Sequence, residues 1–429
     1  MTTPPGRLGT VLARLRALCA DGAAGDGDEA AGGGDGAARL AGPDDELLGL
    51  RPTWVAYPAD TDQVAAVLQY ATASRFAVVV RGTGQRLDWG PAPNAVQLVL
   101  DTSRLTGVIS HDPQRRTAVV RAGSRLDQMA DSFAASGQRL ALDPPGPATL
   151  GGALATGVDG PLRMRYGGTR ELVAELVVVR GDGTVTRTGY DGLPELVAGG
   201  FGGLGVVTEA TVTLHPTPEL RRWVVRTVAS PAEVRLFAGV LVRYPEVAAV
   251  EVHNPYGMGE GPDQLGVLVE GTRERLAERL PRLCAELAAD REGIAVFPRP
   301  PSWWHRYPFG PGEIALRITT PASHLYSSSY IVRDAAGETP VRTRWSPGVA
   351  VMYAGLPGET DPARVARMLE GVRQTLIARD GTCVVLDAPP AVRAAVDMWG
   401  PLPDTAPLRN RKYERDPADI LAPGRLPVA

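Results

Sequence analysis

Three loops of small residues lie beside β-branched runs and could together hold a large anionic ligand. The first follows three valines and contains Arg81, Gly82, Thr83, Gly84, Gln85 and Arg86. The second includes Pro145, Thr149, Gly151, Gly152, Thr156 and Gly157, and the third includes Gly205, Val206 and Val207. Small residues let a ligand approach the backbone, and successive backbone N–H groups in such turns bind anions without a lysine. The loops therefore predict one large anion-binding surface.

The first loop matches neither of two common phosphate-binding motifs. A Rossmann fold or a P-loop would begin a helix after it, whereas Leu87 to Pro91 follows here, and no Gly-Lys-Ser/Thr sequence is present. Taken alone, this loop is equally well explained as a structural turn, and the second loop as a tight Pro/Gly turn. The second loop is, however, longer and richer in small and hydroxyl side chains than a turn requires.

The order and spacing of the three loops carry a family resemblance. With Leu100 to Leu105 and Arg165 to Glu171 between them, they resemble the FAD-binding domain of the vanillyl-alcohol oxidase/p-cresol methylhydroxylase (PCMH) superfamily. The nearest likeness is to the FAD-binding small subunit of bacterial glycolate oxidase. The resemblance covers residues 51–218 closely and residues 392–425 more loosely. It implies an α+β protein with a two-part PCMH-type FAD-binding domain and an α+β cap domain built on an antiparallel sheet.

The resemblance also assigns the loop residues to the cofactor and predicts how the cofactor is held. Relatives that attach FAD covalently have a His in the first loop or a Cys in the second. This chain has Gln85, Arg86 and Thr149 there, so we expect non-covalent FAD. Asp101, in the segment between the first two loops, is expected to shape a turn rather than to bind the cofactor.

Four residues of the second half are candidates for the proton acceptor that alcohol oxidation needs. Glu251 and His253 share one face of an expected strand, as a base and its orienting partner would. His305 lies in an aromatic cluster typical of a substrate pocket, and Tyr353 is a further candidate. Either histidine could equally be a hydrogen-bonded structural residue.

Arginines in the expected cap could bind a carboxylate substrate in a bidentate manner. Arg306 and Arg317 are the substrate-binding candidates, with Arg344 nearby, although arginines on caps are commonly solvated. Related hydroxy-acid dehydrogenases bind a divalent metal through paired cap histidines. This sequence has no such pair, so we predict no metal, a feature it shares with the small glycolate oxidase subunit.

The leading functional prediction is an FAD-dependent oxidoreductase that oxidises a CH–OH group of a small metabolite. A hydroxy acid is the first candidate, followed by a sugar or a specialised-metabolite alcohol. The alternative is a non-catalytic, flavin-carrying subunit of a hetero-oligomer with glycolate-oxidase-like subunits. A reductase using NAD(P)H is a third option, but no nicotinamide fingerprint supports it.

Four segments position these residues. Residues 1–48 are expected to form a helix (7–20) and a flexible linker (21–45), because residues 21–45 have almost no large apolar side chains. Residues 49–220 form the FAD-binding domain, in which Asp60 and Gln63 cap a helix and Ser124 and Asp127 cap another. Residues 221–391 form the cap, with strands at 250–253, 265–270, 313–319, 349–354 and 382–386 and helices at 272–289 and 361–376. Residues 392–429 return to the FAD-binding domain.

The composition limits the classes of protein to which this chain can belong. The chain has 429 residues, 44% of them hydrophobic, and a net charge of −3, which describe an ordinary globular protein. There is no basic run, so nucleic acid is not an expected partner. Three scattered cysteines and the lack of a signal peptide or long apolar run predict a cytoplasmic protein without a membrane span.

Overall fold

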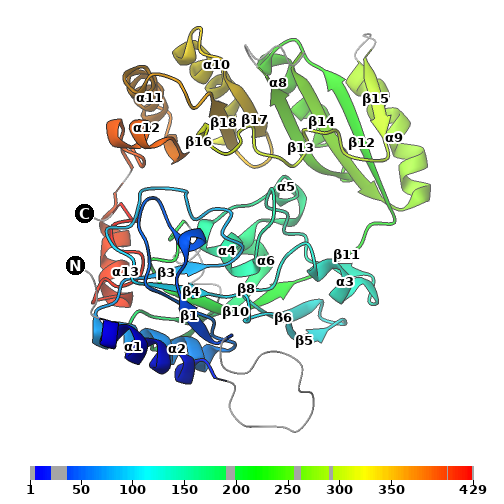
Figure 1. The fold of residues 1–429 in the computed structure, drawn as a ribbon. Coiled ribbons are helices and arrows are strands. Elements are labelled where there is room, and N and C mark those ends of the chain that lie inside the picture. Colours follow the sequence, from blue (N-terminus) through cyan, green and yellow to red (C-terminus); the bar gives the residue numbers. More distant parts are fainter. Residues whose placement is uncertain are drawn as a thin grey trace.

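The computed structural model describes residues 5–20, 36–189, 199–255, 262–288, 293–402 and 404–427. An N-terminal domain, ending at β11 (His215–Pro216), lies below a cap domain that begins at β12 (Leu220–Thr227), and the chain end returns to the lower domain (Figure 1). The chain thus runs from the lower domain to the cap and back.

The first layer of the N-terminal domain is a four-stranded sheet in the order β1-β2-β4-β3. Strand β4 pairs in parallel with β2 and β3, and β1 pairs antiparallel with β2. The Asp60 carboxylate accepts from the Gln63 N–H at 2.8 Å, which confirms the predicted capping of α2. The elements are α1 (Pro5–Leu18), β1 (Ala38–Leu40), β2 (Trp54–Ala56), α2 (Thr61–Ser74), β3 (Val78–Arg81) and β4 (Leu98–Asp101).

The N-terminal helix and part of the expected linker belong to this layer. Val11 and Leu15 of α1 are buried in the same core as α2. The predicted flexible linker is wrong for residues 36–45, because β1 pairs with β2 and the Asp45 carboxylate binds Arg39 at 2.6 Å and Arg81 at 2.8 Å. Ion pairs and strand pairing order this segment in place of apolar burial. Residues 21–35 lie outside the described residues.

The second layer is a five-stranded antiparallel sheet in the order β5-β6-β10-β8-β9. The predicted cap of the following helix is wrong: α3 begins at Met129, the Ser124 hydroxyl bonds to Gly107, and Asp127 pairs with Arg125. The elements are β5 (Val108–Asp112), β6 (Thr117–Arg121), α3 (Met129–Ala134), β7 (Gln138–Arg139), α4 (Leu150–Thr156), α5 (Arg163–Tyr166), α6 (Thr169–Leu172), β8 (Val173–Val179), β9 (Val185–Gly189) and β10 (Val206–Thr213).

The cap is one eight-stranded sheet with its helices on one face, as predicted (Figure 1). The strand order is β15-β12-β14-β13-β17-β18-β16-β19, and every pair is antiparallel. One side of the sheet packs on α8, α9, α10 and α11 in a single apolar core. The elements are α8 (Pro231–Leu241), β13 (Val247–Asn254), β14 (Gln264–Gly271), α9 (Arg273–Ala288), β15 (Ile294–Phe297), β16 (Ile314–Thr319), α10 (Leu325–Ala336), β17 (Arg342–Ser346), β18 (Val351–Leu356), α11 (Pro362–Ile377), β19 (Thr382–Asp387) and α12 (Pro390–Ala395).

The end of the chain crosses from the cap to the N-terminal domain. The predicted boundary at residue 391 falls inside α12, and both Val392 and Met398 are buried in the cap core, so the cap extends past it. After α13 (Ala406–Arg415), the backbone runs beside β3. The Val78 N–H donates to the Ile420 carbonyl at 2.7 Å, and the Ala422 N–H donates to the Val78 carbonyl at 2.9 Å.

A buried ion-pair cluster joins the two domains on the side of α5. The Glu270 carboxylate of the cap accepts from Arg139 at 2.6 Å and from the Tyr166 hydroxyl at 2.6 Å, both in the N-terminal domain. Arg221 of the cap lies 2.9 Å from the same carboxylate. Because its partners come from both domains, Glu270 links the cap to the N-terminal domain.

Candidate active site

The three loops meet around one cavity, here called the loop cavity. Twelve of the fifteen predicted cofactor residues line it: Gly82, Thr83, Gly84, Gln85, Arg86, Thr149, Gly151, Gly152, Thr156, Gly205, Val206 and Val207. Segments that are more than 120 residues apart in the sequence thus form a single binding surface. The exceptions are Arg81, Pro145 and Gly157.

The first loop has the unsatisfied donors that a pyrophosphate needs. The five consecutive backbone N–H groups of residues 82–86 make no hydrogen bond to any group in the described ranges. A side chain at position 82 would collide with the Thr149 hydroxyl 2.4 Å away, and Gly84 has φ +80°. Successive free N–H groups in such a turn form an anion-binding concavity. The loop therefore fits a diphosphate group.

The two arginines of the first loop differ, because Arg86 lines the loop cavity as expected and Arg81 does not. The Arg81 guanidinium points away from the loop cavity and binds Asp101 at 2.6 Å and Asp45 at 2.8 Å. Asp101 also accepts from the Ser103 N–H at 2.9 Å, which is the expected turn geometry. Arg86 lines the cavity and donates to the Pro145 carbonyl at 2.5 Å, so it braces the first loop against the second.

The returning tail adds a cation that the sequence did not identify. Arg425 lines the loop cavity although it is only 2% exposed, and its guanidinium donates to the carbonyls of Leu87, at 2.7 Å, and Trp89. Burial lowers the pKa of Arg425 to about 10, so it remains charged at neutral pH. The sequence offered one signal for Arg425. It directly follows Pro423 and Gly424, at the end of residues 392–425, which resemble the FAD-binding family loosely.

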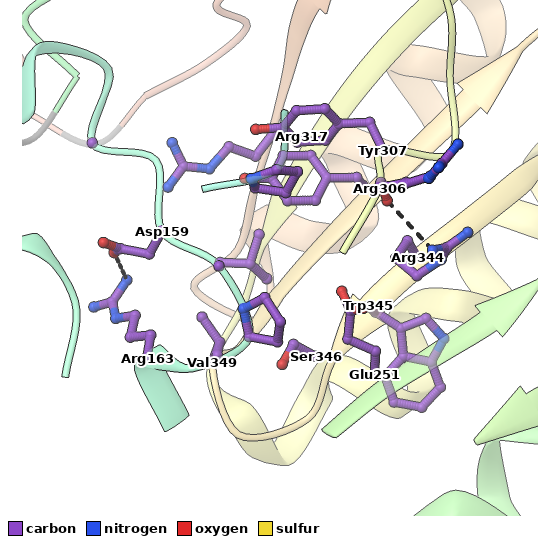
Figure 2. Close-up of a pocket in the computed structure, with 16 residues that line it drawn as sticks. Asp159, Arg163, Glu251, Arg306, Tyr307, Arg317, Arg344, Trp345, Ser346 and Val349 are labelled. Atoms are coloured by element: carbon purple, nitrogen blue, oxygen red, sulfur yellow. Dashed lines mark hydrogen bonds and ion pairs between the residues drawn. The ribbon is translucent and has the colours of Figure 1, made fainter. Parts of the chain in front are cut away.

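A second cavity lies between the domains and is here called the interdomain cavity (Figure 2). It begins where the loop cavity ends: Thr156 lines the loop cavity, and the next residue, Gly157, lines the interdomain cavity together with Pro145. The guanidinium of Arg86 also lies over the Tyr307 ring, 5.9 Å from its centroid, at this junction. The two cavities therefore lie next to each other at the second loop.

The cap contributes a row of side chains across adjacent strands to the interdomain cavity. Arg344 of β17 is paired with Tyr353 of β18, which is paired with Arg317 of β16. Directly paired residues of antiparallel strands point to the same face, so the three side chains stand side by side. Strands lie about 4.8 Å apart, which separates the two arginines by roughly 10 Å along the row.

Arg317 is the cation best placed to receive a substrate anion. Its guanidinium makes no hydrogen bond or ion pair with any group in the part of the chain that the structure describes. By contrast, Arg163 in the same cavity binds the Asp159 carboxylate at 2.9 Å (Figure 2). The Arg306 side chain is exposed, and its backbone carbonyl accepts a hydrogen bond from Arg344. Of the two predicted substrate residues, the geometry therefore favours Arg317.

Two of the four predicted proton acceptors line the interdomain cavity. Glu251 is 6% exposed, and burial raises its pKa from 4.5 to about 7. Its carboxylate accepts a hydrogen bond from the backbone N–H of His305 at 2.8 Å. His305 has φ +57°, a backbone conformation uncommon for a residue with a side chain. Burial also raises the pKa of Tyr353, so that hydroxyl is a proton donor at neutral pH.

The two predicted histidines are held by contacts with neighbouring groups. The ring of His305 donates from Nε2 to the Asp143 carbonyl at 2.5 Å, which ties the cap to the second loop. His253 is stacked on Trp303, with ring centroids 5.4 Å apart, and bonds to Arg344. Neither is among the residues that line the interdomain cavity. In the described residues no group of three or more His, Cys, Asp or Glu side chains is arranged to hold a metal ion.

With this geometry in place, comparison with known proteins identifies the class of the N-terminal domain. Residues 52–189 match the family described as an FAD binding domain. These residues therefore form an FAD-binding domain, FAD is the ligand that fits the loop cavity, and the PCMH-type resemblance is confirmed.

The chain is similar in sequence to several curated proteins. It is 33% identical to D-lactate dehydrogenase of Archaeoglobus fulgidus over 175 residues, which cover 38% of each chain. It is 32% identical to glycolate oxidase subunit GlcD of Bacillus subtilis over 182 residues, 40% of this chain and 38% of that one. It is 34% identical to D-2-hydroxyglutarate dehydrogenase of Xanthomonas citri pv. viticola over 178 residues, 39% and 38%. The matches thus span less than two fifths of these relatives' length.

A solved structure shows the same fold over most of the chain. Alkyldihydroxyacetonephosphate synthase has a TM-score of 0.62 at 15% identity, with 88% of this chain and 78% of that chain covered. Because 88% of this chain is covered, the likeness in fold extends to the cap. No helix in the described ranges is long and apolar enough to cross a membrane.

Proposed function

We propose that this protein is an FAD-dependent oxidoreductase that oxidises the CH–OH group of a hydroxy acid. The observation that carries the proposal is the interdomain cavity, beside the second loop. It is lined by Glu251, whose pKa is raised to about 7, and by Arg317, which has no hydrogen-bond partner among the described residues. The relatives named as lactate, glycolate and 2-hydroxyglutarate enzymes support the hydroxy-acid class.

The cavity side chains have separate roles in this reaction. Arg317 and Arg344 bind the substrate carboxylate, because guanidinium groups form strong, charge-assisted hydrogen bonds with carboxylates. Glu251 accepts the hydroxyl proton, since a base with a pKa near the working pH combines the ionised form with a useful basicity. Bound FAD supplies the hydride acceptor, and the product is the 2-oxo acid. Tyr353, protonated beside both arginines, donates a hydrogen bond to the substrate.

We further propose that FAD is held without a covalent bond. None of the twenty residues that line the loop cavity is a His, Cys or Tyr, the side chains that could form such a tether. The free N–H groups of residues 82–86 and the guanidinium of Arg425 supply binding energy instead. A cytoplasmic location stays a prediction.

Anaerobic mixing with hydroxy acids tests the proposal. The FAD-loaded protein should lose its flavin absorbance in the visible range and release one 2-oxo acid per flavin. If the protein binds FAD but no hydroxy acid bleaches it until glycolate-oxidase-like subunits are added, the chain is a flavin-carrying subunit. If a sugar or another alcohol bleaches it and hydroxy acids do not, the substrate class is wrong.

A further inference from the structure

We propose that His253 is a positioning residue that acts through Arg344, rather than the proton acceptor of the reaction. The inference rests on the proposed function in one respect only: Arg344 is taken to bind the substrate anion. It concerns how the guanidinium is held in place before an anion arrives.

The hydrogen bond between the two side chains fixes the protonation of the imidazole. An Arg344 Nη atom lies 3.1 Å from His253 Nδ1. A guanidinium has only donors, so Nδ1 must be the unprotonated nitrogen and the proton of the neutral ring must be on Nε2. The lone pair that a general base would use is therefore already occupied by Arg344.

The surroundings of His253 keep it neutral. The residue is 8% exposed, its ring is stacked on Trp303, and Arg342 and Arg344 lie on the neighbouring strand. Burial and these two cations lower the pKa of His253 to about 4. The carboxyl of Glu251 lies on the same face of β13, and Gln264 of β14 is paired with His253. A neutral acceptor is what the adjacent guanidinium needs.

Arg344 in turn reaches the cavity from a buried position. It is 5% exposed, its guanidinium lies 5.0 Å from the Trp303 ring centroid, and it also donates to the Arg306 carbonyl at 3.4 Å. Figure 2 shows this bond at the cap side of the cavity. The contact with Arg306 is longer than the 3.1 Å bond to His253, so of these two hydrogen bonds the one to His253 restrains the guanidinium more strongly.

Substitutions that move the acceptor by one atom test the role. In His253→Asn the amide oxygen occupies the place of Nδ1, whereas in His253→Gln it lies near the place of Nε2. The probe is oxalate, a dicarboxylate without a C–H bond to oxidise, titrated into the FAD-loaded protein by its effect on the flavin spectrum. We expect Kd for oxalate to change less than threefold in His253→Asn and to rise about tenfold in His253→Gln and His253→Leu, since a hydrogen bond to a charged group is lost.

A cycle with Arg344→Met separates positioning from general destabilisation. In that background, His253→Leu should change Kd for oxalate by less than twofold, because the group it acts through is absent. In addition, the NMR resonance of His253 can be assigned as the histidine signal that is lost in His253→Asn. In the parent this signal should titrate with a pKa well below 6.5, and the pKa should rise in Arg344→Met because a neighbouring cation is removed. This readout requires no ligand.

Several results would overturn the inference. The inference is wrong if the parental protein does not bind oxalate or if the parent and His253→Leu have equal Kd values for it. It is also wrong if His253→Leu still raises this Kd tenfold in the Arg344→Met background, or if Arg344→Met leaves the pKa of the His253 resonance unchanged. A drop of 100-fold or more in flavin reduction for His253→Asn with unchanged Kd would make His253 the base. Failure of all hydroxy acids to reduce the flavin would refute the proposed function but would leave these binding results valid.

Discussion

Replacing Glu251 by Gln should make the protein more stable at alkaline pH while it removes activity. The folded-state pKa of Glu251 is raised from 4.5 to about 7 by burial, a difference of about 2.5 units. The favourable contribution of the protonated carboxyl is fully present below pH 4.5 and is lost as the pH rises through about 7. At 1.36 kcal/mol per unit, the raised pKa of Glu251 lowers folding stability by about 3 kcal/mol at pH 8, where the folded carboxyl is ionised. At pH 5 it lowers stability by about 1 kcal/mol, because the carboxyl must take up a proton on folding.

The amide of Glu251→Gln avoids this cost. Its carbonyl oxygen can still accept from the His305 N–H, so the local hydrogen bond is retained. An unfolding entropy of about 2.1 cal/mol/K per residue gives about 0.9 kcal/mol/K for 429 residues. The variant should therefore melt about 3 °C higher than the parent at pH 8 and about 1 °C higher at pH 5. The rate of flavin reduction should fall by about 10² or more, because the proton acceptor is gone.

Thermal unfolding of FAD-loaded protein at the two pH values, paired with stopped-flow flavin reduction, measures both effects. The matched control is Glu278→Gln on α9, whose carboxyl is 61% exposed and should show no pH-dependent gain. A Glu251→Gln protein that is less stable than the parent at pH 8, or that reduces its flavin at the parental rate, would refute the assignment.

Three further predictions follow from the cavity and the domain interface. Acid or heat denaturation should release all of the FAD into the supernatant, and flavin that remains in the pellet would contradict non-covalent binding. Gly152→Trp should abolish FAD binding because the side chain fills the loop cavity, whereas Gly239→Trp on the exposed side of α8 should leave FAD content unchanged; full occupancy in the Gly152 variant would show the second loop to be misassigned. Glu270→Ala should cost about 3–5 kcal/mol by leaving Arg139 buried without its partner, against less than about 0.5 kcal/mol for the exposed Glu278→Ala, and equal melting temperatures would argue against the interdomain cluster.

The loops and the regular elements could be predicted because their signals are local. Glycines and hydroxyl side chains beside valine runs mark the loops, and the helical spacing in 361–376 matches α11 (Pro362–Ile377). The cap strands β12, β15 and β17 were not predicted. In β17, Arg342 and Arg344 interrupt the apolar pattern because their side chains lie on the face toward the N-terminal domain.

The composition of the site depends on contacts that no local pattern encodes. Arg425 reaches the loop cavity only because the tail runs beside β3, more than 300 residues earlier in the chain. The row of Arg344, Tyr353 and Arg317 depends on strand order in the sheet, which alternation alone does not specify. His305 carries the expected aromatic neighbours, yet its ring is used to tie the cap to the second loop.

The most direct test of the account is the anaerobic reaction of the FAD-loaded parent with a panel of 2-hydroxy acids, beside Glu251→Gln and Arg317→Met. We predict that at least one acid bleaches the parental flavin and yields one 2-oxo acid per flavin. Glu251→Gln should bind that acid with similar affinity but reduce its flavin at least 100-fold more slowly, and Arg317→Met should chiefly weaken binding. Absence of bleaching by every acid, with the flavin fully bound, would contradict the assignment of the interdomain cavity as a hydroxy-acid oxidation site.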